Sequence, residues 1–321
     1  MRTPNDEPSG QGARCPIGAR TRRCYAERGA GPVRVVPGCA PRQAMLQLAA
    51  VTDVHFGRRT RFEGRLRKLA DLAPELTRQL AVELQGRRPR LVVNLGDVIE
   101  DETAALDRQR YAEALGILEH ALGHERLVSI AGNHDSVNLG LADLRELWGM
   151  PGPGPLYRSW ELEGMHFVAL HTQEHKDTDI SLDAEQLRWL RADLAANRLP
   201  TVVLMHHSAA DQDLRGNRWF ERSGHIALVR EPERRELRAL LREHGRTVLV
   251  LNGHLHWNHL FVDDGIPYVT LQSLTENIQE DEPGEPAGAW AWVELDPSGL
   301  RIEVAGRQPA RYQVGWQTPR W

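Results

Sequence analysis

The chain has 321 residues, of which 41% are apolar and 26% are charged, a composition typical of a folded globular protein. No apolar run approaches the roughly 18 residues that a membrane-spanning helix needs, so we expect no membrane partner. The formal net charge is −4, yet residues 1–44 carry eight arginines against three acidic residues. The remainder is therefore acidic, which argues against a nucleic-acid polymer as partner.

Residues 1–44 are rich in Gly, Pro and Arg and show no periodicity, so we expect a disordered N-terminal extension. All three cysteines of the chain lie there, at Cys15, Cys24 and Cys39. Their spacing matches no zinc-ribbon or CxxC pattern. We hypothesise that the natural chain starts at Met45, and peptides from 1–44 in a mass map of the native protein would refute this. Without a signal peptide, the cytoplasm is the expected location.

From residue 45 to residue 321 the pattern predicts one domain in which strands and helices alternate. The first half is expected to contain a strand at 46–52, a helix at about 62–85 with a kink at Pro74, a strand at 90–95, a helix at about 104–122 and a strand that ends at Gly132. The second half is expected to contain a hairpin of strands 156–162 and 165–171, a helix at about 183–196 capped by Asp183, a strand that ends at His206, a helix at 233–244, a strand that ends at Gly253, and strands at 258–263, 266–272, 288–295 and 299–305. The fold class is therefore α/β, with two packed sheets flanked by helices.

Five short polar segments each directly follow one of the apolar runs that predict buried strands. They are Asp53-Val54-His55, Gly96-Asp97, Gly132-Asn133-His134-Asp135, His206-His207 and Gly253-His254-Leu255-His256. Open α/β sheets place their sites outside the carboxyl ends of their strands. We therefore expect the five segments to deliver their side chains to one place.

The side chains in these segments are the types that bind metal ions. Two aspartates supply carboxylates, of which one could bridge a pair of cations, an asparagine supplies a carbonyl oxygen and several histidines supply imidazoles. Mixed nitrogen and oxygen ligation suits Mn, Fe, Co, Ni or Zn better than Mg or Ca. Two such ions about 3.5–4 Å apart attract a phosphate ester, activate a water molecule and stabilise an in-line displacement at phosphorus.

In this order and at these distances, the five motifs resemble the calcineurin-like metallophosphoesterase family, and the resemblance covers residues 46 to about 272. It implies a four-layer α/β/β/α sandwich with a dinuclear site at the strand ends. Carried over by motif, it implies two metal sites that share a carboxylate: Asp53, His55 and His256 hold one ion, Asn133, His206 and His254 hold the other, and Asp97 bridges them. The ions would be two divalent transition metals, Mn, Fe or Zn.

The resemblance also implies roles in catalysis. His134 would contact the scissile phosphate and act as general acid toward the leaving group or stabilise its charge, Asp135 would orient it, and a hydroxide that bridges the metals would be the nucleophile. Many relatives carry prolines after the fourth-motif histidine, whereas this chain reads His206-His207-Ser208-Ala209. His207 therefore remains an alternative ligand, although we favour His206 because it directly follows the apolar strand.

We expect a phosphohydrolase that acts on a small-molecule phosphate ester, either a phosphodiester or a small nucleotide-type ester. The motif layout is similar to the bacterial cyclic-nucleotide phosphodiesterase branch. Alternatives are a phosphomonoesterase, a nucleoside-diphosphate-linked pyrophosphohydrolase, and a non-catalytic binding scaffold, against which the complete set of ligand positions argues. Arg58, Arg59 and Arg61 could contact phosphate or form a solvated turn. Trp219-Phe220 could line the substrate site or, as we favour, anchor the 207–232 insertion.

Overall fold

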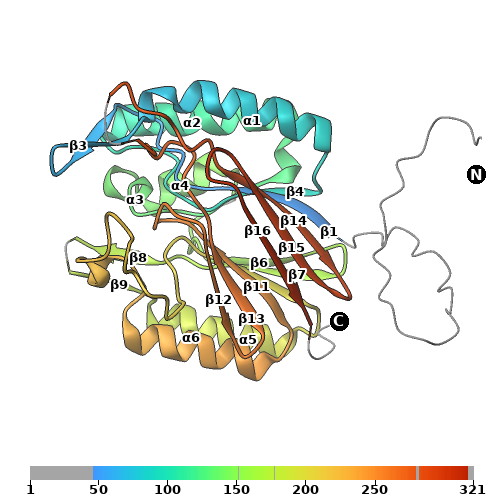
Figure 1. Ribbon diagram of the computed structural model, residues 1–321. Coiled ribbons are helices and arrows are strands. Elements are labelled where there is room, and N and C mark those ends of the chain that lie inside the picture. The colour runs from blue at the N-terminus through green and yellow to red at the C-terminus, as the bar shows by residue number, and fades with distance from the viewer. Residues whose placement is uncertain (1–45, 151, 177, 280–281, 317–321) are drawn as a thin grey trace, which may run out of the picture. The chain divides into compact units, whose positions relative to one another are not determined.

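The computed structural model describes residues 46–150, 152–176, 178–279 and 282–316 (Figure 1). In this part of the chain two six-stranded sheets form the centre of the fold. The first has the order β16-β15-β14-β1-β4-β5, and these strands span Ala310–Gly315, Gly299–Ala305, Trp290–Asp296, Leu46–Val51, Leu91–Asn94 and Leu127–Ser129. The second has the order β12-β13-β11-β10-β7-β6, and these strands span His259–Asp263, Ile266–Thr270, Thr247–Asn252, Thr201–Leu204, Met165–Ala169 and Arg158–Leu162.

Both sheets are mixed, and their parallel strands point their carboxyl ends in a common direction. In the first sheet β1 pairs parallel with β4, and β4 pairs parallel with β5. In the second sheet β10 lies between β11 and β7 and is parallel to both. The outer strands pair in antiparallel register. The ends of β1, β4 and β5 therefore share one sheet edge, and so do the ends of β10 and β11.

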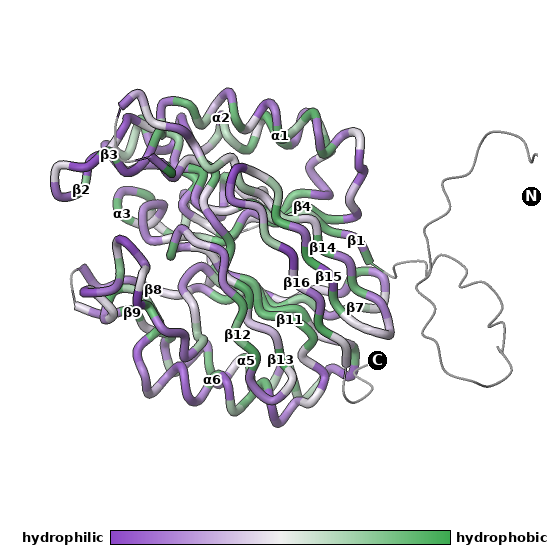
Figure 2. Tube along the Cα trace, viewed as in Figure 1, coloured by the Kyte–Doolittle hydropathy of each residue, from purple (hydrophilic) through white to green (hydrophobic). Residues whose placement is uncertain are grey.

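The apolar core lies between the sheets and on their outer faces. An inner cluster joins residues of both sheets, among them Leu48, Val93, Phe167, Val202 and Leu249. All four residues of β4 are buried, and the first three are apolar, as expected for a strand that is covered on both faces. In Figure 2 the apolar residues, drawn in green, accordingly concentrate along the strands. Burial of one such aliphatic side chain contributes roughly 1.5–3 kcal/mol.

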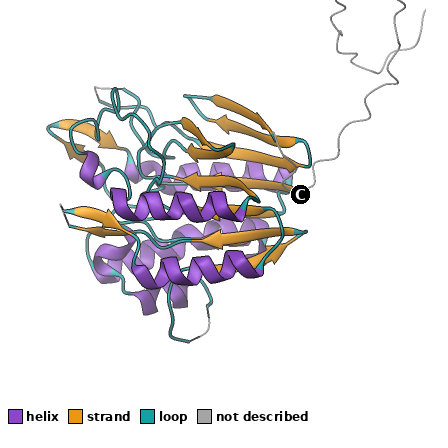
Figure 3. Cartoon of the chain, turned by 90° about the horizontal axis from the view of Figure 1, so that it is seen from below, coloured by secondary structure: helices purple, strands orange, loops and turns teal. Residues whose placement is uncertain are grey.

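Helices cover the outer face of each sheet. Against the first sheet pack α1 (Ala73–Arg87) and α2 (Ala104–Leu122). Against the second pack α5 (Ala184–Ala196) and α6 (Glu231–His244). Figure 3 shows helices running roughly along the strands that they cover. The layers are therefore α/β/β/α, which confirms the predicted fold class.

Capping residues explain where two of these helices begin. The Asp183 carboxylate accepts a hydrogen bond from the Gln186 backbone N–H at 2.6 Å, as the sequence predicted for the start of α5. The Thr103 hydroxyl accepts one from Leu106 at the start of α2. Each cap stabilises its helix by about 1 kcal/mol.

The predicted helix at 62–85 is wrong in its first part. Residues 60–68 instead form a hairpin of β2 (Thr60–Phe62) and β3 (Arg65–Lys68), followed by the short η1 (Ala70–Leu72). The turn is Glu63-Gly64, the same dipeptide that turns the β6–β7 hairpin at residues 163–164. Pro74 does not kink a helix; it lies in the first turn of α1, where a missing N–H breaks no hydrogen bond.

Several short elements escaped prediction because a segment of three to seven residues is too short to show a clear period. They are β8 (Gln173–His175), β9 (Asp179–Ser181), α3 (Asp135–Asn138), α4 (Leu141–Leu147), η2 (His124–Arg126) and η3 (Gly224–Ile226). β16 was also not predicted. Predictions about residues 1–44 and Met45 lie outside the described residues. Within the described part of the chain, no helix is long and apolar enough to cross a membrane.

Candidate metal centre

The five polar segments meet where the strand ends of the two sheets converge. Backbone hydrogen bonds of 3.0 Å continue past the strands of the first sheet, from Asp53 to Gly96 and from His55 to Asp97. The second sheet is continued in the same way, from Gly253 to His206 at 3.0 Å. The His254 backbone N–H donates to the Asp53 carboxylate at 2.9 Å, which ties the two sheets together. The prediction that the segments meet is confirmed.

One group of ligand atoms comes from Asp53, His55 and His256. The Nε2 of His256 lies 3.2 Å from Asp53 Oδ1 and 3.3 Å from the Nε2 of His55. His55 Nε2 is 3.9 Å from Asp53 Oδ1 and 3.8 Å from Asp97 Oδ2. Atoms about 2.0–2.2 Å from one ion lie roughly 3–3.5 Å from each other, so this group has nearly the spacing of a ligand set.

A second group centres on His206. Its Nε2 lies 3.1 Å from the Asn133 side-chain oxygen and 3.4 Å from Asp97 Oδ2. The same Asp97 oxygen therefore faces both groups. The His254 ring completes this side, with its centroid 5.2 Å from that of His206. A carboxylate placed between two sets of donors has the position of a bridging ligand.

The outer nitrogen of each of the four imidazoles lies against a protein oxygen. These contacts join His206 Nδ1 to the Leu95 carbonyl at 2.8 Å, His256 Nδ1 to Glu276 at 2.7 Å, His254 Nε2 to the Ile226 carbonyl at 2.8 Å and His55 Nδ1 to Glu100 at 3.0 Å. An N–H directed at an oxygen leaves the lone pair of the neutral ring on the other nitrogen, which is the form a cation requires. The donor set therefore fits divalent metal ions.

Burial and charge act on this centre in opposite directions. Burial alone would raise the pKa of the Asp53 and Asp97 carboxyls, but the adjacent His256 and His206 hold both pKa values well below their usual range. Burial, together with the nearby His206, lowers the pKa of His254 to about 3. His206 is different, because Asp97 overcomes its burial and raises its pKa to about 10. A bound cation would displace that proton.

Backbone strain is concentrated at the same residues. Positive φ angles of 49–67° occur at Asp53, His55, Asp97, His254 and His256. Such angles are uncommon outside glycine and cost of order 1–3 kcal/mol each. The other described non-glycine residues with positive φ precede a glycine in a tight turn or end helix α1. Strain that has no turn to explain it is typical of functional sites.

Two glycines permit the close packing of these loops. A Cβ on Gly132 would lie 2.1 Å from Asp97 Oδ1, and one on Gly253 would lie 1.8 Å from the Thr52 hydroxyl. Thr52 in turn donates a hydrogen bond to Asp53 Oδ2 at 2.6 Å. Only glycine fits these positions without moving the two aspartates.

His134 lies at the rim of the centre, with its side chain 24% exposed. Its backbone N–H donates to Asp97 Oδ1 at 2.9 Å, and its Nδ1 contacts the Asp101 carboxylate. We expected Asp135 to orient this ring, but the carboxylate that contacts the ring is that of Asp101. The Asp135 carboxylate accepts backbone N–H groups, including those of Val98 and Gly132 at 2.9 Å each, and so fixes the two loops instead.

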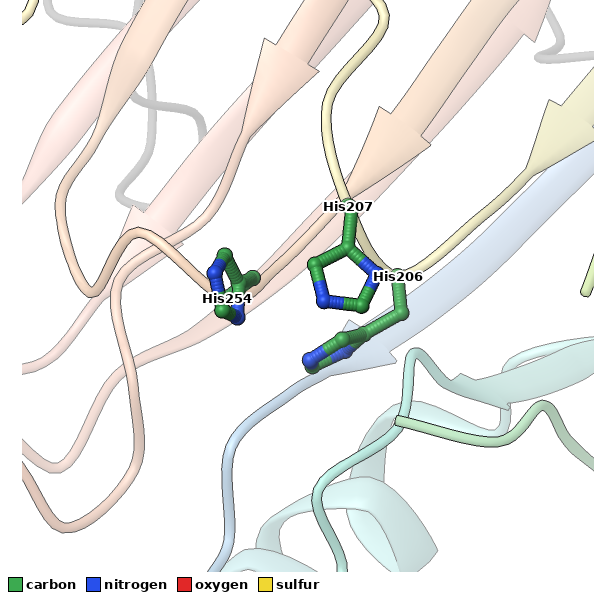
Figure 4. Close-up of side chains that lie close together, drawn as sticks. All are labelled: His206, His207 and His254. Carbon is green, nitrogen blue, oxygen red and sulfur yellow. The ribbon is translucent and has the colours of Figure 1, made fainter. Parts of the chain in front are cut away.

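His207 lies against His206 and His254, and ligand atoms of these three rings come within 4.8 Å of one another. Figure 4 shows its ring next to those of His206 and His254, with centroid distances of 4.7 and 4.2 Å. The His207 Nδ1 lies 2.7 Å from the Thr172 hydroxyl. Since only His206 of the pair approaches Asn133 and Asp97 within hydrogen-bonding distance among the described contacts, the geometry favours His206 as the ligand.

The structure also shows where the candidate substrate-binding residues from the sequence lie. Trp219 and Phe220 are buried with Ala227, Leu228 and Leu255, so they anchor the insertion as we favoured. Arg58, Arg59 and Arg61 have side chains 36–79% exposed and pair with carboxylates, which makes a solvated basic turn. A cavity of about 600 Å³ opens beside the centre and is lined by Asp101, Asn133, Ser136, His171, Thr172 and Glu174.

Sequence reasoning missed Glu276, which contacts both His256 and the indole N–H of Trp219 at 2.7 Å. It also missed Asp101 and the support that Glu100 gives to His55. Glu276 follows no motif, and it reaches the centre only because the loop after β13 lies across the end of β1. No local signal could have identified it.

Comparisons with known proteins agree with this geometry. The model of the calcineurin-like phosphoesterase family matches residues 46–258. A probable cyclic nucleotide phosphodiesterase from Synechococcus sp. is 32% identical over 220 residues, 67% of this chain and 76% of that protein. A cAMP/cGMP dual specificity phosphodiesterase from Mycobacterium tuberculosis is 30% identical over 216 residues, 65% of this chain and 61% of that protein.

Solved structures with the same fold include two proteins that are phosphatases by name. A dimetal phosphatase from Danio rerio superposes with a TM-score of 0.64 at 16% identity, covering 85% of this chain and 100% of that one. A purple acid phosphatase from yellow lupin seeds gives a TM-score of 0.59 at 13% identity, covering 84% of this chain and 53% of that one. At these identities the likeness concerns the fold. With the family model matched across both sheets and all five motifs, the chain belongs to the calcineurin-like phosphoesterase family.

Proposed function

We propose that this protein is a dinuclear metal-dependent phosphohydrolase that cleaves a phosphodiester or a small nucleotide-type ester. One observation carries the proposal: Asp97 faces two groups of buried donor atoms. The outer nitrogens of His206, His254 and His256 hydrogen-bond to protein oxygens, and that of His55 lies 3.0 Å from Glu100. A buried structural histidine also satisfies its N–H, but it does not need to turn its second nitrogen toward carboxylates and other imidazoles. A metal ligand does, because its inner nitrogen must present a lone pair.

The residues that would hold the ions are those of the two groups. The first site is formed by Asp53, His55 and His256, the second by Asn133, His206 and His254, and the bridge by Asp97. Mixed nitrogen and oxygen donors favour Mn, Fe or Zn. When bound, two divalent cations would activate a water molecule and neutralise charge on the phosphate.

The residues of the chain itself would position the ester. His134, held by Asp101 at the rim, would lie on the leaving-group side of the phosphate. The cavity beside Asn133 and Asp101 would accommodate the organic group of the substrate, since about 600 Å³ is a common volume for a small-molecule site. Nearly all of its lining residues carry polar side chains, which can hydrogen-bond to a hydrophilic ester.

The preference for a diester is supported by the names of the two relatives, each at least 30% identical. The test compares bis-(p-nitrophenyl) phosphate with p-nitrophenyl phosphate, using metal-stripped protein refilled with Mn²⁺. Faster cleavage of the diester is expected. Faster cleavage of the monoester would make the protein a phosphomonoesterase. Two bound metals with no cleavage of either compound would favour a binding scaffold or a narrow pyrophosphate specificity.

A further inference from the structure

Lys68 is a buried lysine in a chain that almost exclusively uses arginine. Of 40 Lys and Arg residues, only Lys68 and Lys176 are lysines. The Lys68 side chain is 4% exposed and lies at the end of β3, close to the metal centre. An ammonium is a compact charge with three donors on a flexible stem, whereas a guanidinium is a larger planar fork. A buried lysine at this position therefore indicates that a compact cationic hydrogen-bond donor is required there, and not a guanidinium.

Two contacts fix the Lys68 ammonium. It forms an ion pair with Glu100, and its Nζ lies 3.2 Å from Nε2 of His134. An ammonium has only donors, so Nε2 must accept this hydrogen bond. The proton of the neutral imidazole then resides on Nδ1, where it faces the Asp101 carboxylate. At the Nε2 side of the His134 ring, the available hydrogen-bond donor is therefore the Lys68 ammonium and not the ring itself.

The backbone holds Lys68 in register with the centre. Lys68 forms a β-bridge with Glu276, the residue that contacts His256. On either side, the Asn277 N–H donates to the Arg67 carbonyl at 2.7 Å, and the Leu69 N–H donates to the Thr275 carbonyl at 2.9 Å. The position of Lys68 is thus tied to the loop that also orients a predicted metal ligand.

We propose that Lys68 is a catalytic residue whose ammonium donates a hydrogen bond to the leaving oxygen of the ester, with His134 and Glu100 as its positioning residues. The inference deepens the proposed function and rests on it. As the bond from phosphorus to the leaving oxygen breaks, negative charge develops on that oxygen, and a fixed cation in a buried site stabilises it strongly. Glu100 offsets the repulsion between Lys68 and the two cations.

The kinetic test uses metal-loaded Lys68→Met and a series of methyl aryl phosphates whose leaving groups run from p-nitrophenolate to phenolate. Loss of the donor should reduce turnover by roughly 10²-fold for phenolate and much less for p-nitrophenolate, which needs little stabilisation. Lys68→Arg should recover part of the loss. In the His134→Ala background, Lys68→Met should reduce turnover far less than it does in the wild type, because the two residues act as a unit. Equal losses across the series, or additive effects, would overturn the proposal.

Removing Lys68 alone leaves the Glu100 carboxylate buried without its partner, which can unfold the protein. The Lys68→Met/Glu100→Gln double variant, compared with Glu100→Gln, avoids this and should show the same dependence on the leaving group. Arg311→Met removes an exposed positive charge on β16 and serves as the control with unchanged kinetics.

A second readout does not depend on activity. In the Zn²⁺-loaded protein, ¹⁵N NMR of the His134 ring, assigned by its loss in His134→Asn, should show a protonated Nδ1 and an unprotonated Nε2. A protonated Nε2 would make His134 the donor and refute the assignment to Lys68. If the wild type cleaves no ester in the series, the proposed function fails, while this measurement still decides whether Lys68 donates to His134.

Discussion

Asp97 is the residue on which a paired centre depends. Its Oδ2 lies 3.8 Å from the Nε2 of His55 and 3.4 Å from the Nε2 of His206, so one oxygen faces both donor groups. The other oxygen of Asp97, Oδ1, accepts a hydrogen bond from the His134 backbone N–H. One side chain thus connects both donor groups to the loop that carries the rim histidine.

Asp97→Ala should therefore abolish the binding of a metal pair. Metal analysis after dialysis against Mn²⁺ should find fewer than two ions per chain, because the bridge between the sites is lost. Asp213→Ala, at an exposed carboxylate that pairs with Arg215 and not with a predicted ligand, is the matched control and should keep two. Two tightly bound ions in Asp97→Ala would rule out the bridging role.

His134→Ala should separate metal binding from turnover. The ring is not among the predicted ligands, so both ions should remain bound. Turnover should fall by on the order of 10²–10⁴-fold, because the ring lies beside the leaving group and positions the Lys68 ammonium that would stabilise it. The measurement pairs metal content with kcat, and a loss of metal in this variant would mean that the role assigned to His134 is wrong.

The loops that follow the strands are the elements that build the centre. They leave the sheet in conformations that only glycine or a strained residue can adopt, and they interlock through backbone hydrogen bonds. The His254 backbone N–H, for example, donates to Asp53 from the other sheet. A change in one loop should therefore be felt by ligands on another.

Gly253→Ala tests this interlocking. The new methyl group would lie 1.8 Å from the Thr52 hydroxyl and 2.5 Å from Asp53 Oδ2, so a loop must move. We expect a loss of about 1–3 kcal/mol in the free energy of unfolding and weaker metal binding. Gly116→Ala, in α2 with no atom within 4 Å of the new Cβ, should instead stabilise by about 0.5–1 kcal/mol. Urea titrations compare them, and equal effects would contradict this account.

The whole domain is needed to form the centre, because its donors come from the strand ends of both sheets. Folding therefore brings together residues as distant in sequence as Asp53 and His256, which lie 3.2 Å apart. The same long-range closure makes metal binding and domain stability thermodynamically linked.

Removing the ions should lower the melting temperature. A ligand that binds only the folded state at 100 times its Kd stabilises that state by about 2.7 kcal/mol. Calorimetry before and after chelation should show the decrease, and refilling with Mn²⁺ should reverse it. An unchanged melting temperature would mean that the buried donors do not bind the metal in the folded protein.

Stability should also fall as the solution becomes mildly acidic. Burial, followed by the nearby His166 and Arg198, lowers the pKa of His244 to about 4. Between pH 6.5 and pH 4 the unfolded chain therefore binds a proton that the folded chain does not, so unfolding becomes easier as the pH falls through this window. Denaturation midpoints at pH 7.5 and pH 5 should differ less in His244→Asn than in the wild type. An equal difference would exclude His244 as a cause.

Local sequence by itself predicted most strands of the two sheets and four main helices, and it named the seven residues that are proposed as ligands, because apolar runs, caps and strand-end motifs are signals within a few residues. It misplaced the hairpin at residues 60–68 because Leu66 and Leu69 also fit a helical period. Only the tertiary structure decided that Asp101 rather than Asp135 holds His134, that Glu276 orients His256, and that Lys68 lies against His134. Each of these contacts joins segments from different strands, and its geometry exists only after the sheets and loops have packed.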